Sequence, residues 1–278
     1  MSTKIGDWEY ISNREYHDRP EIGSSDLKTI LNCPRKYVAE TLRAETKSKR
    51  RGSLIHTLVL EPDRLHEDYI IVDVGSRNAK KYKEAVEKNS DGHAVVLAHE
   101  VVEAQAIADS VLSSDAWGML TRGIEPRWIV SESSIFWEEG GVVQKCRPDL
   151  LIKDAHESGL WTCVDLKTTR DASPAGFAKS VVQYGYDLSA AHYTQGIRSA
   201  GIEIEAFVLL AVETTEPYVV QGYVLGPDAI ERGDYLRSLA LQKFARLDEK
   251  CPEGYCQYPI DDLIMPAWSM RILDEGEL

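Results

Sequence analysis

The sequence of 278 residues has no hydrophobic run that approaches the roughly 20 apolar residues needed to cross a bilayer. Its first ten residues are polar and include Asp7 and Glu9, which is not the pattern of a secretory signal. From these two absences we expect a cytoplasmic protein with no membrane partner.

Cysteine is scarce, and its five positions do not have the spacing of a zinc site. They are Cys33, Cys146, Cys163, Cys251 and Cys256. Cys146 and Cys163 lie in segments with the pattern of strands. We expect both to be buried thiols in a reducing compartment.

Positive charge is also in deficit, because 32 Lys and Arg against 45 Asp and Glu give a net charge of −13. This balance argues against a protein that coats nucleic acid nonspecifically. It does not exclude a nuclease, whose DNA path can be locally basic. One basic run, with Lys47, Lys49, Arg50 and Arg51, fits such a path. Charge runs are equally typical of solvated loops, so both interpretations stay open.

With 43% hydrophobic residues and no repeat, low-complexity tract or clear linker, the chain is expected to build one domain. Helical patterns come first, then β-rich runs, two helices, two strands and a long helix. This order favours an α/β fold with a mixed central sheet flanked by helices. We expect a mainly helical N-terminal part, residues 1–115, and a sheet-containing core, residues 116–278.

Apolar spacing places the individual elements. A helix after residue 23 is predicted to be capped by Ser24 or Ser25. Residues 51–60 have a helical pattern that puts Gly52 and His56 on one face. Further helices are predicted over residues 78–89, 98–112, 174–182, 186–200 and 227–250.

The strand predictions centre on a hairpin. Two β-rich runs, residues 129–138 and 142–152, flank Glu139-Gly140-Gly141, and glycine supplies the positive φ of a tight turn. A buried strand follows over residues 159–167. Two more are predicted over residues 204–212 and 218–224.

Two short segments carry the chemistry: Arg147-Pro148-Asp149-Leu150 and Asp165-Leu166-Lys167-Thr168. Residues i and i+2 of a strand share a face, so Asp165 and Lys167 are predicted to point the same way. Val164 and Leu166 then point into the core. A third strand after a hairpin can bring Asp149 beside Asp165.

Paired carboxylates can bind a divalent metal, and a lysine beside them can orient a water. These groups together are sufficient for metal-dependent phosphodiester hydrolysis. A lone Asp-x-Lys is more often a solvated surface pair. Here, however, it lies in an apolar strand, where charge is costly to bury unless it is paired or binds a metal.

Five segments in order resemble one known family. They are an N-terminal segment (residues 12–27), a Gly-x-x-x-His motif (52–62), a Glu-containing strand (132–137) and the two motifs at 146–149 and 164–169. Together they resemble the RecE-type exonuclease VIII nucleases, in the RecB-like branch of the PD-(D/E)XK superfamily. The resemblance implies a restriction-endonuclease-like core with a helical N-terminal elaboration.

The resemblance also implies roles for individual residues. His56, Asp149 and Asp165 match metal ligands, with the carbonyl of Leu166 as a further oxygen ligand for Mg²⁺, which Mn²⁺ can replace. Lys167 matches the lysine that positions the attacking water. Glu132 matches an acidic residue at the edge of the site. Without the resemblance, a lone His56 on an apolar helix is more typical of the core, and Glu132 is equally consistent with a surface strand.

The sequence departs from the family at one motif, a Gln followed four residues later by a Tyr. Tyr193 matches the Tyr and is assigned to DNA contact, but Ser189 stands where the Gln would be. Gln183 and Gln195 have other spacings. How this helix holds the DNA backbone is therefore open.

As a whole, the resemblance implies a 5′-to-3′ exonuclease that acts on linear double-stranded DNA ends and leaves 3′ single-stranded tails. It further implies a ring-shaped homo-oligomer. The partner would be a single-strand annealing protein in homologous recombination, often from a phage or prophage.

Two alternatives remain. An iron–sulfur nuclease would begin with a Cys-Pro such as Cys33-Pro34, but it needs three C-terminal cysteines, and only Cys251 and Cys256 follow. A non-catalytic DNA-binding scaffold is possible because fold does not fix function. It should show a broken site, whereas all the matched site residues are present.

Overall fold

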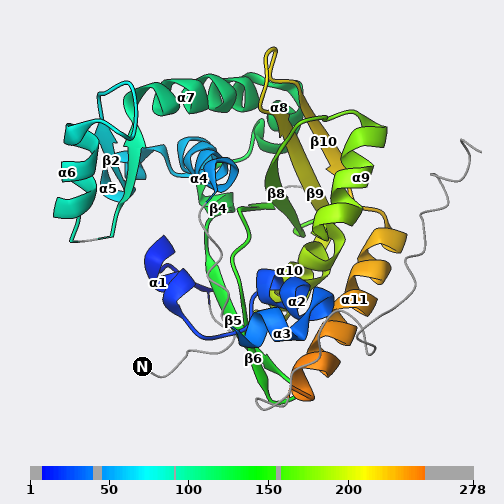
Figure 1. The fold of residues 1–278 in the computed structure, drawn as a ribbon. Coiled ribbons are helices and arrows are strands. Elements are labelled where there is room, and N and C mark those ends of the chain that lie inside the picture. Colours follow the sequence, from blue (N-terminus) through cyan, green and yellow to red (C-terminus); the bar gives the residue numbers. More distant parts are fainter. Residues whose placement is uncertain (1–7, 40–45, 91, 155–157, 248–278) are drawn as a thin grey trace, which may run out of the picture.

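The structure is a computed structural model of the chain, and it describes residues 8–39, 46–90, 92–154 and 158–247 (Figure 1). The helices are α1 (Asn13–Asp18), α2 (Ser24–Asn32), α3 (Pro34–Val38), α4 (Lys47–Leu60), α5 (Leu65–Asp68), α6 (Lys80–Lys88), α7 (Ala98–Ser113), α8 (Asp115–Thr121), α9 (Pro174–Tyr184), α10 (Tyr186–Ser199) and α11 (Pro227–Ala245). Short 3₁₀ turns span Pro62–Arg64 and Pro126–Trp128.

The strands are β1 (Trp8–Glu9), β2 (Tyr69–Val72), β3 (Ala94–Leu97), β4 (Ile129–Ser131), β5 (Ser134–Glu139), β6 (Val142–Cys146), β7 (Leu150–Lys153), β8 (Trp161–Thr169), β9 (Ile204–Glu213) and β10 (Val220–Val224). Five of them form the central sheet, in the order β10-β9-β8-β7-β4. Strands β8 and β9 are parallel, and the other neighbours are antiparallel. The predicted mixed sheet with flanking helices is confirmed.

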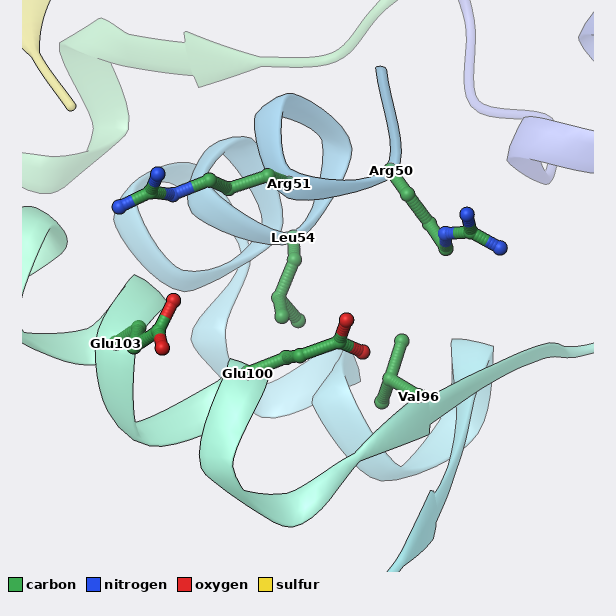
Figure 2. A pocket seen from close by; sticks show the side chains of 6 residues that line it. All are labelled: Arg50, Arg51, Leu54, Val96, Glu100 and Glu103. Carbon is green, nitrogen blue, oxygen red and sulfur yellow. The ribbon is translucent and has the colours of Figure 1, made fainter. Parts of the chain in front are cut away.

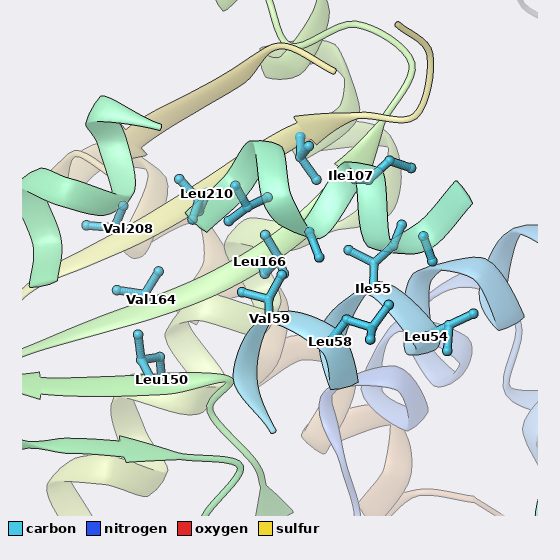
Figure 3. Packing of buried hydrophobic residues seen from close by; sticks show 14 of the residues in the cluster. Leu54, Ile55, Leu58, Val59, Ile107, Leu150, Val164, Leu166, Val208 and Leu210 are labelled. Carbon is cyan, nitrogen blue, oxygen red and sulfur yellow. The ribbon is translucent and has the colours of Figure 1, made fainter. Parts of the chain in front are cut away.

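Each face of the central sheet is covered by helices. On one face, Val164 and Leu166 of β8 pack with α4 and α7 through residues such as Ile55 and Ile107 (Figure 3). On the other face, Cys163 packs with Phe177 of α9 and with α10. In β8, residues 163–166 are buried, and Asp165 is the one charged residue among these four, so its charge stands out.

The predicted hairpin is confirmed at its turn and in the strand segments next to the turn, but the outer parts of the two predicted strands do not belong to it. Gly140 and Gly141 have φ values of +60° and +80° and connect β5 to β6. However, each predicted long strand is divided between two sheets. Strands β4 and β7 belong to the central sheet, whereas β5 and β6 pair with each other in a second sheet of order β1-β5-β6. The breaks fall at Glu132, whose φ is +48°, and at Pro148, which has no N–H for the ladder.

Two helix starts also differ from the predictions. Gly23, rather than a serine, is the N-cap of α2, and its N–H donates to the Asp26 Oδ2 at 2.9 Å. Helix α4 begins at Lys47, after Thr46, whose hydroxyl accepts from the Lys49 N–H at 3.2 Å. The basic run is therefore the start of a helix rather than a loop, and its role in a DNA path stays a prediction.

The other predicted elements are present with ends shifted by a few residues. Helix α11 ends at Ala245, and the predicted extension over residues 248–250 lies outside the described residues, as do Cys251 and Cys256. Cys146 and Cys163 are buried free thiols, as predicted, and Cys33 is a third. Within the described ranges, no helix is long and apolar enough to cross a membrane. The proposed division near residue 115 stays a prediction, although β1 from the first part pairs with β5 of the second.

The fully buried His192 predicts an acid-sensitive fold. Its ring lies 4.8 Å from that of Trp137, and its Nε2 is 2.9 Å from the Lys145 carbonyl. Burial lowers the pKa of His192 to about 4, from 6.5. Because the unfolded chain takes up the proton first, the stability is fully present above pH 6.5 and is lost as the pH falls toward 4. The full shift corresponds to roughly 3 kcal/mol.

We expect His192→Gln, which keeps an amide donor for the Lys145 carbonyl but does not titrate, to weaken this pH dependence. Urea unfolding at pH 7 and at pH 4.5 measures it. The loss of unfolding free energy between the two should be smaller by about 2 kcal/mol in the variant. Equal losses in the two proteins would show that His192 does not cause the acid sensitivity.

Candidate active site

Side chains from four separate segments meet at the end of the central sheet. Asp165 and Lys167 come from β8, and Asp149 directly precedes the neighbouring strand β7. His56 comes from α4, and Glu132 lies in the break between β4 and β5. The structure thus brings together all five residues that the sequence singled out for catalysis.

The antiparallel register explains how Asp149 reaches β8. Leu150 pairs with Val164, so Asp149 lies opposite the segment that carries Asp165. The Asp149 carboxylate is buried, and its Oδ2 accepts the backbone N–H of Leu166 at 2.7 Å. The same oxygen is 3.5 Å from the His56 Nδ1. One carboxylate therefore connects the two strands with α4.

Asp165 and Lys167 form the second half of the site. The Lys167 Nζ is 2.5 Å from the Asp165 Oδ1 and 3.4 Å from the Leu166 carbonyl oxygen, which confirms that the two side chains share a face. Asp165 is only 1% exposed. Its Oδ2 is buried and has no hydrogen-bond partner among the described residues. A buried carboxylate oxygen without a donor is costly unless something absent from the protein chain pairs with it.

A cation beside Asp165 would pair with that oxygen. Next to Asp165, ligand atoms of His56, Glu132 and Asp149 all lie within 4.8 Å of one another, in a group that does not itself include Asp165. The Glu132 N–H donates to the Asp149 carbonyl at 3.2 Å, and its φ of +48° is unusual for a residue other than glycine. Such backbone strain is common at functional sites. Carboxylate oxygens with one imidazole nitrogen fit a divalent cation.

The electrostatics agree with a cation site. Burial raises the pKa of Asp149 well above its usual value, and Asp165 adds to the effect. Burial raises the pKa of Glu132 to about 7, although Arg147 opposes the shift. Both shifts disfavour the charged carboxylates, mainly because the groups are buried, and a bound divalent cation would favour the charged forms again.

The pKa values of the two basic groups, His56 and Lys167, are shifted in opposite directions. Burial lowers the pKa of His56 to about 4, and Lys167 adds to the decrease, so the imidazole is neutral near pH 7 and its lone pair is available to a metal. Burial also disfavours the charge on Lys167, but Asp165 and Asp149 outweigh it and raise the pKa of Lys167 above its usual value. Lys167 is therefore an ammonium donor rather than a general base.

Two residues near the site had no role in the sequence analysis. The buried guanidinium of Arg147 donates to the Ser134 Oγ and the Ile11 carbonyl, both at 3.0 Å, and so ties the N-terminal segment to the strand before Asp149. The ring centre of Tyr186 is 5.3 Å from the Lys167 Nζ. Because Arg147 stands next to Pro148-Asp149 in the sequence, its place near the site could have been predicted. The approach of Tyr186 to β8 arises only from tertiary packing.

The basic residues at the start of α4 differ in their exposure to solvent. Lys49 is exposed, whereas Arg50 and Arg51 are half-buried. Arg51 donates to the Thr214 carbonyl at 2.7 Å. Both arginines border a cavity of about 20 Å³ and extend from α4 in opposite directions (Figure 2); its lining also includes Leu54, Val96, Glu100 and Glu103. A cavity of this size holds one water at most. Arg51 thus has a packing role.

The predicted DNA-contact residue Tyr193 faces the fold. It is half-buried in α10, and its ring centre is 6.4 Å from that of Phe207 on β9. Ser189, one turn earlier, is buried as well. A role of Tyr193 in DNA contact stays a prediction. The iron–sulfur alternative gains no support, because Cys33 is the only one of its proposed ligands within the described ranges.

Two solved structures resemble this chain, to different degrees. A solved structure from Eubacterium rectale, described as a "Putative exonuclease", superposes with a TM-score of 0.58 at 13% identity, covering 96% of this chain and 99% of that one. A "phage related exonuclease" from Haemophilus somnus 129PT gives a TM-score of 0.33 at 12% identity, over 84% and 96% of the chains. At 13% identity, the first likeness establishes a shared fold. No curated protein matches the sequence.

Residues 23–248 match the family described as "PDDEXK-like domain of unknown function (DUF3799)". The matched range contains α4, the strands β7 and β8, and all five residues of the candidate site. Because the match covers most of the chain, the protein belongs to this family of PDDEXK-like domains, with the nuclease-like fold of the PD-(D/E)XK superfamily.

Proposed function

We propose that this protein is a divalent-metal-dependent nuclease, and more specifically an exodeoxyribonuclease that acts on linear double-stranded DNA ends. The observation that carries the proposal is the environment of the buried Asp165 carboxylate. Its Oδ1 accepts a hydrogen bond from Lys167, and its Oδ2 has no hydrogen-bond partner among the described residues. A structural ion pair would need no such open oxygen. The shared fold with a solved protein described as an exonuclease supports the same direction.

Mg²⁺ is the proposed cofactor, and Mn²⁺ is expected to substitute for it. His56, Asp149, Asp165 and the Leu166 carbonyl would hold the ion, with Glu132 completing the set. When bound, the cation supplies Lewis-acid stabilisation of the negative charge on the phosphate. The Lys167 ammonium, fixed by Asp165, orients the attacking water and stabilises the charge that develops on the phosphate oxygens. Neutral His56 keeps its lone pair without adding charge.

The finer features rest on the resemblance to RecE-type nucleases. They are 5′-to-3′ polarity, 3′ single-stranded products, a ring-shaped homo-oligomer around DNA and action with a single-strand annealing protein in recombination. The cytoplasm is the proposed location. The intact set of His56, Asp149, Asp165 and Lys167 supports catalysis over a purely scaffolding role.

The deciding experiment is digestion of a linear duplex that is labelled at either the 5′ or the 3′ end, with Mg²⁺ or with EDTA. A closed circular duplex is the control. We expect Mg²⁺-dependent loss of the 5′ label from linear DNA alone. Loss of the 3′ label first would reverse the proposed polarity. Cutting of the circle would indicate an endonuclease. DNA that is bound but never digested would favour the scaffold.

Lys49 offers a test of the proposed DNA path along α4. Neutralising Lys49, Arg50 and Arg51 together would also remove the hydrogen bond from Arg51 to Thr214. We therefore expect the single variant Lys49→Ala to weaken duplex binding and to reduce the slope of log K against log salt by about 1. A salt titration by fluorescence anisotropy in EDTA measures this.

The matched control is Lys80→Ala, because the Lys80 side chain is 92% exposed on the distant helix α6 (Figure 1). It should leave the slope unchanged. Equal slopes for Lys49→Ala and the wild type would remove α4 from the DNA path.

A further inference from the structure

An aromatic pair lies beside the catalytic lysine. Helices α9 and α10 are joined by the single residue Gly185, which adopts the left-handed conformation (φ +60°, ψ +45°). This sharp bend makes Tyr184 the last residue of α9 and Tyr186 the first of α10. Their ring centres are 5.7 Å apart, with 32° between the planes. A side chain at residue 185 would be strained, so the bend and the pairing of the two rings depend on glycine.

The two rings have different surroundings. Tyr186 is half-buried, and its ring centre lies 6.2 Å from that of Phe177, 5.3 Å from the Lys167 Nζ and 5.6 Å from the Lys28 Nζ. Its position is thus fixed by packing. Tyr184, in contrast, is 53% exposed. Lys167 therefore lies next to the fixed ring of Tyr186, and Tyr186 lies next to the solvent-exposed ring of Tyr184.

We propose that Tyr184 and Tyr186 form a stacking surface for a nucleobase of the DNA strand whose phosphate enters the site at Lys167. This inference rests on the proposed nuclease function. Proteins that hold single strands without sequence preference combine aromatic faces with cations along the backbone path, and every base offers a π-face. Tyr184 supplies the open face, and Lys28 and Lys167 supply the cations. The ligand class is an unpaired nucleotide at a DNA end, of any sequence.

The exposed position of Tyr184 makes a clean variant available. The probe is a short thymidine oligonucleotide with one 2-aminopurine at its 5′ end, because the fluorescence of this base falls when it stacks on an aromatic ring. Binding is measured in EDTA, so no hydrolysis occurs. We expect the wild-type protein to quench the probe. Tyr184→Ala should lose most of the quenching and bind about ten-fold more weakly, whereas Tyr184→Phe should retain both properties.

The matched control is Tyr235→Ala, since Tyr235 is 67% exposed on α11. It should behave as the wild type, and thermal unfolding of each variant checks that the fold is intact. The proposal is overturned if the wild type leaves the fluorescence unchanged at saturation, or if Tyr184→Ala quenches and binds as the wild type does.

The proposed nuclease function and the proposed stacking surface can be rejected independently of each other. Quenching that depends on Tyr184, without Mg²⁺-dependent digestion by the wild type, would keep the stacking surface and reject the nuclease. Digestion of linear DNA with quenching that is independent of Tyr184 would keep the nuclease and reject the stacking surface.

Discussion

Replacing Lys167 with alanine is expected to lower the rate of linear DNA digestion by about 10²–10³-fold while DNA binding in EDTA persists. The Lys167 Nζ lies 2.5 Å from Asp165, and its raised pKa keeps it charged across the working pH range. Loss of this charge removes a donor that acts mainly on the transition state, so the rate of hydrolysis should fall much more than the affinity.

A matched control for this variant lies on the neighbouring strand. Lys153 ends β7, and its Nζ lies over the ring of Trp128 at 4.8 Å, outside the group of five site residues. Lys153→Ala should digest DNA at nearly the wild-type rate. Single-turnover digestion with Mg²⁺ separates hydrolysis from product release. Wild-type rates in Lys167→Ala would assign the positioning of the water to another group.

The Lys167→Ala variant should also depend more strongly on metal for its stability. Without the ammonium, Asp165 is a buried carboxylate with no paired charge, which is strongly destabilising. A divalent cation would restore a positive charge at the same place. Thermal unfolding should therefore show a larger stabilisation by Mg²⁺ in the variant than in the wild type.

A large effect on stability is also expected at Gly233, in the middle of α11. A Cβ there would lie 2.5 Å from the carbonyl carbon of Asp187 on α10, and closer still to its oxygen. These are backbone atoms, so relief requires the two helices to separate. Helix propensity alone would make Gly233→Ala stabilising by about 1 kcal/mol. We expect the clash to reverse the sign and to cost about 2–3 kcal/mol.

Urea unfolding of Gly233→Ala measures this effect. Gly75→Ala is the control, because no heavy atom lies within 4 Å of a Cβ added at Gly75. Its unfolding free energy should be close to that of the wild type. An unchanged or increased stability of Gly233→Ala would mean that α10 and α11 are not in close backbone contact. Because Tyr186 directly precedes Asp187, Gly233→Ala is also expected to reduce activity.

Local rules account for the parts of this protein that the sequence alone determined. The two-residue period of a strand placed Asp165 and Lys167 on one face and Val164 and Leu166 in the core, as the structure confirms. Helical spacing located α6, α7, α9 and α10 within a few residues. The Gly140-Gly141 turn was predictable for the same reason, since each of these patterns depends on residues that are close along the chain.

Tertiary structure decided the rest. Pro148 was a sequence signal for one break in the β-rich runs, because proline has no N–H for the ladder. The sequence contains no signal for the break at Glu132 or for the division of the runs between two sheets, and the break at Glu132 brings this residue to His56 and Asp149. The bond from Arg51 to Thr214 and the approach of Tyr186 to Lys167 likewise join segments far apart in sequence. Such contacts depend on how helices and sheets pack, and spacing along the chain carries no information about that packing.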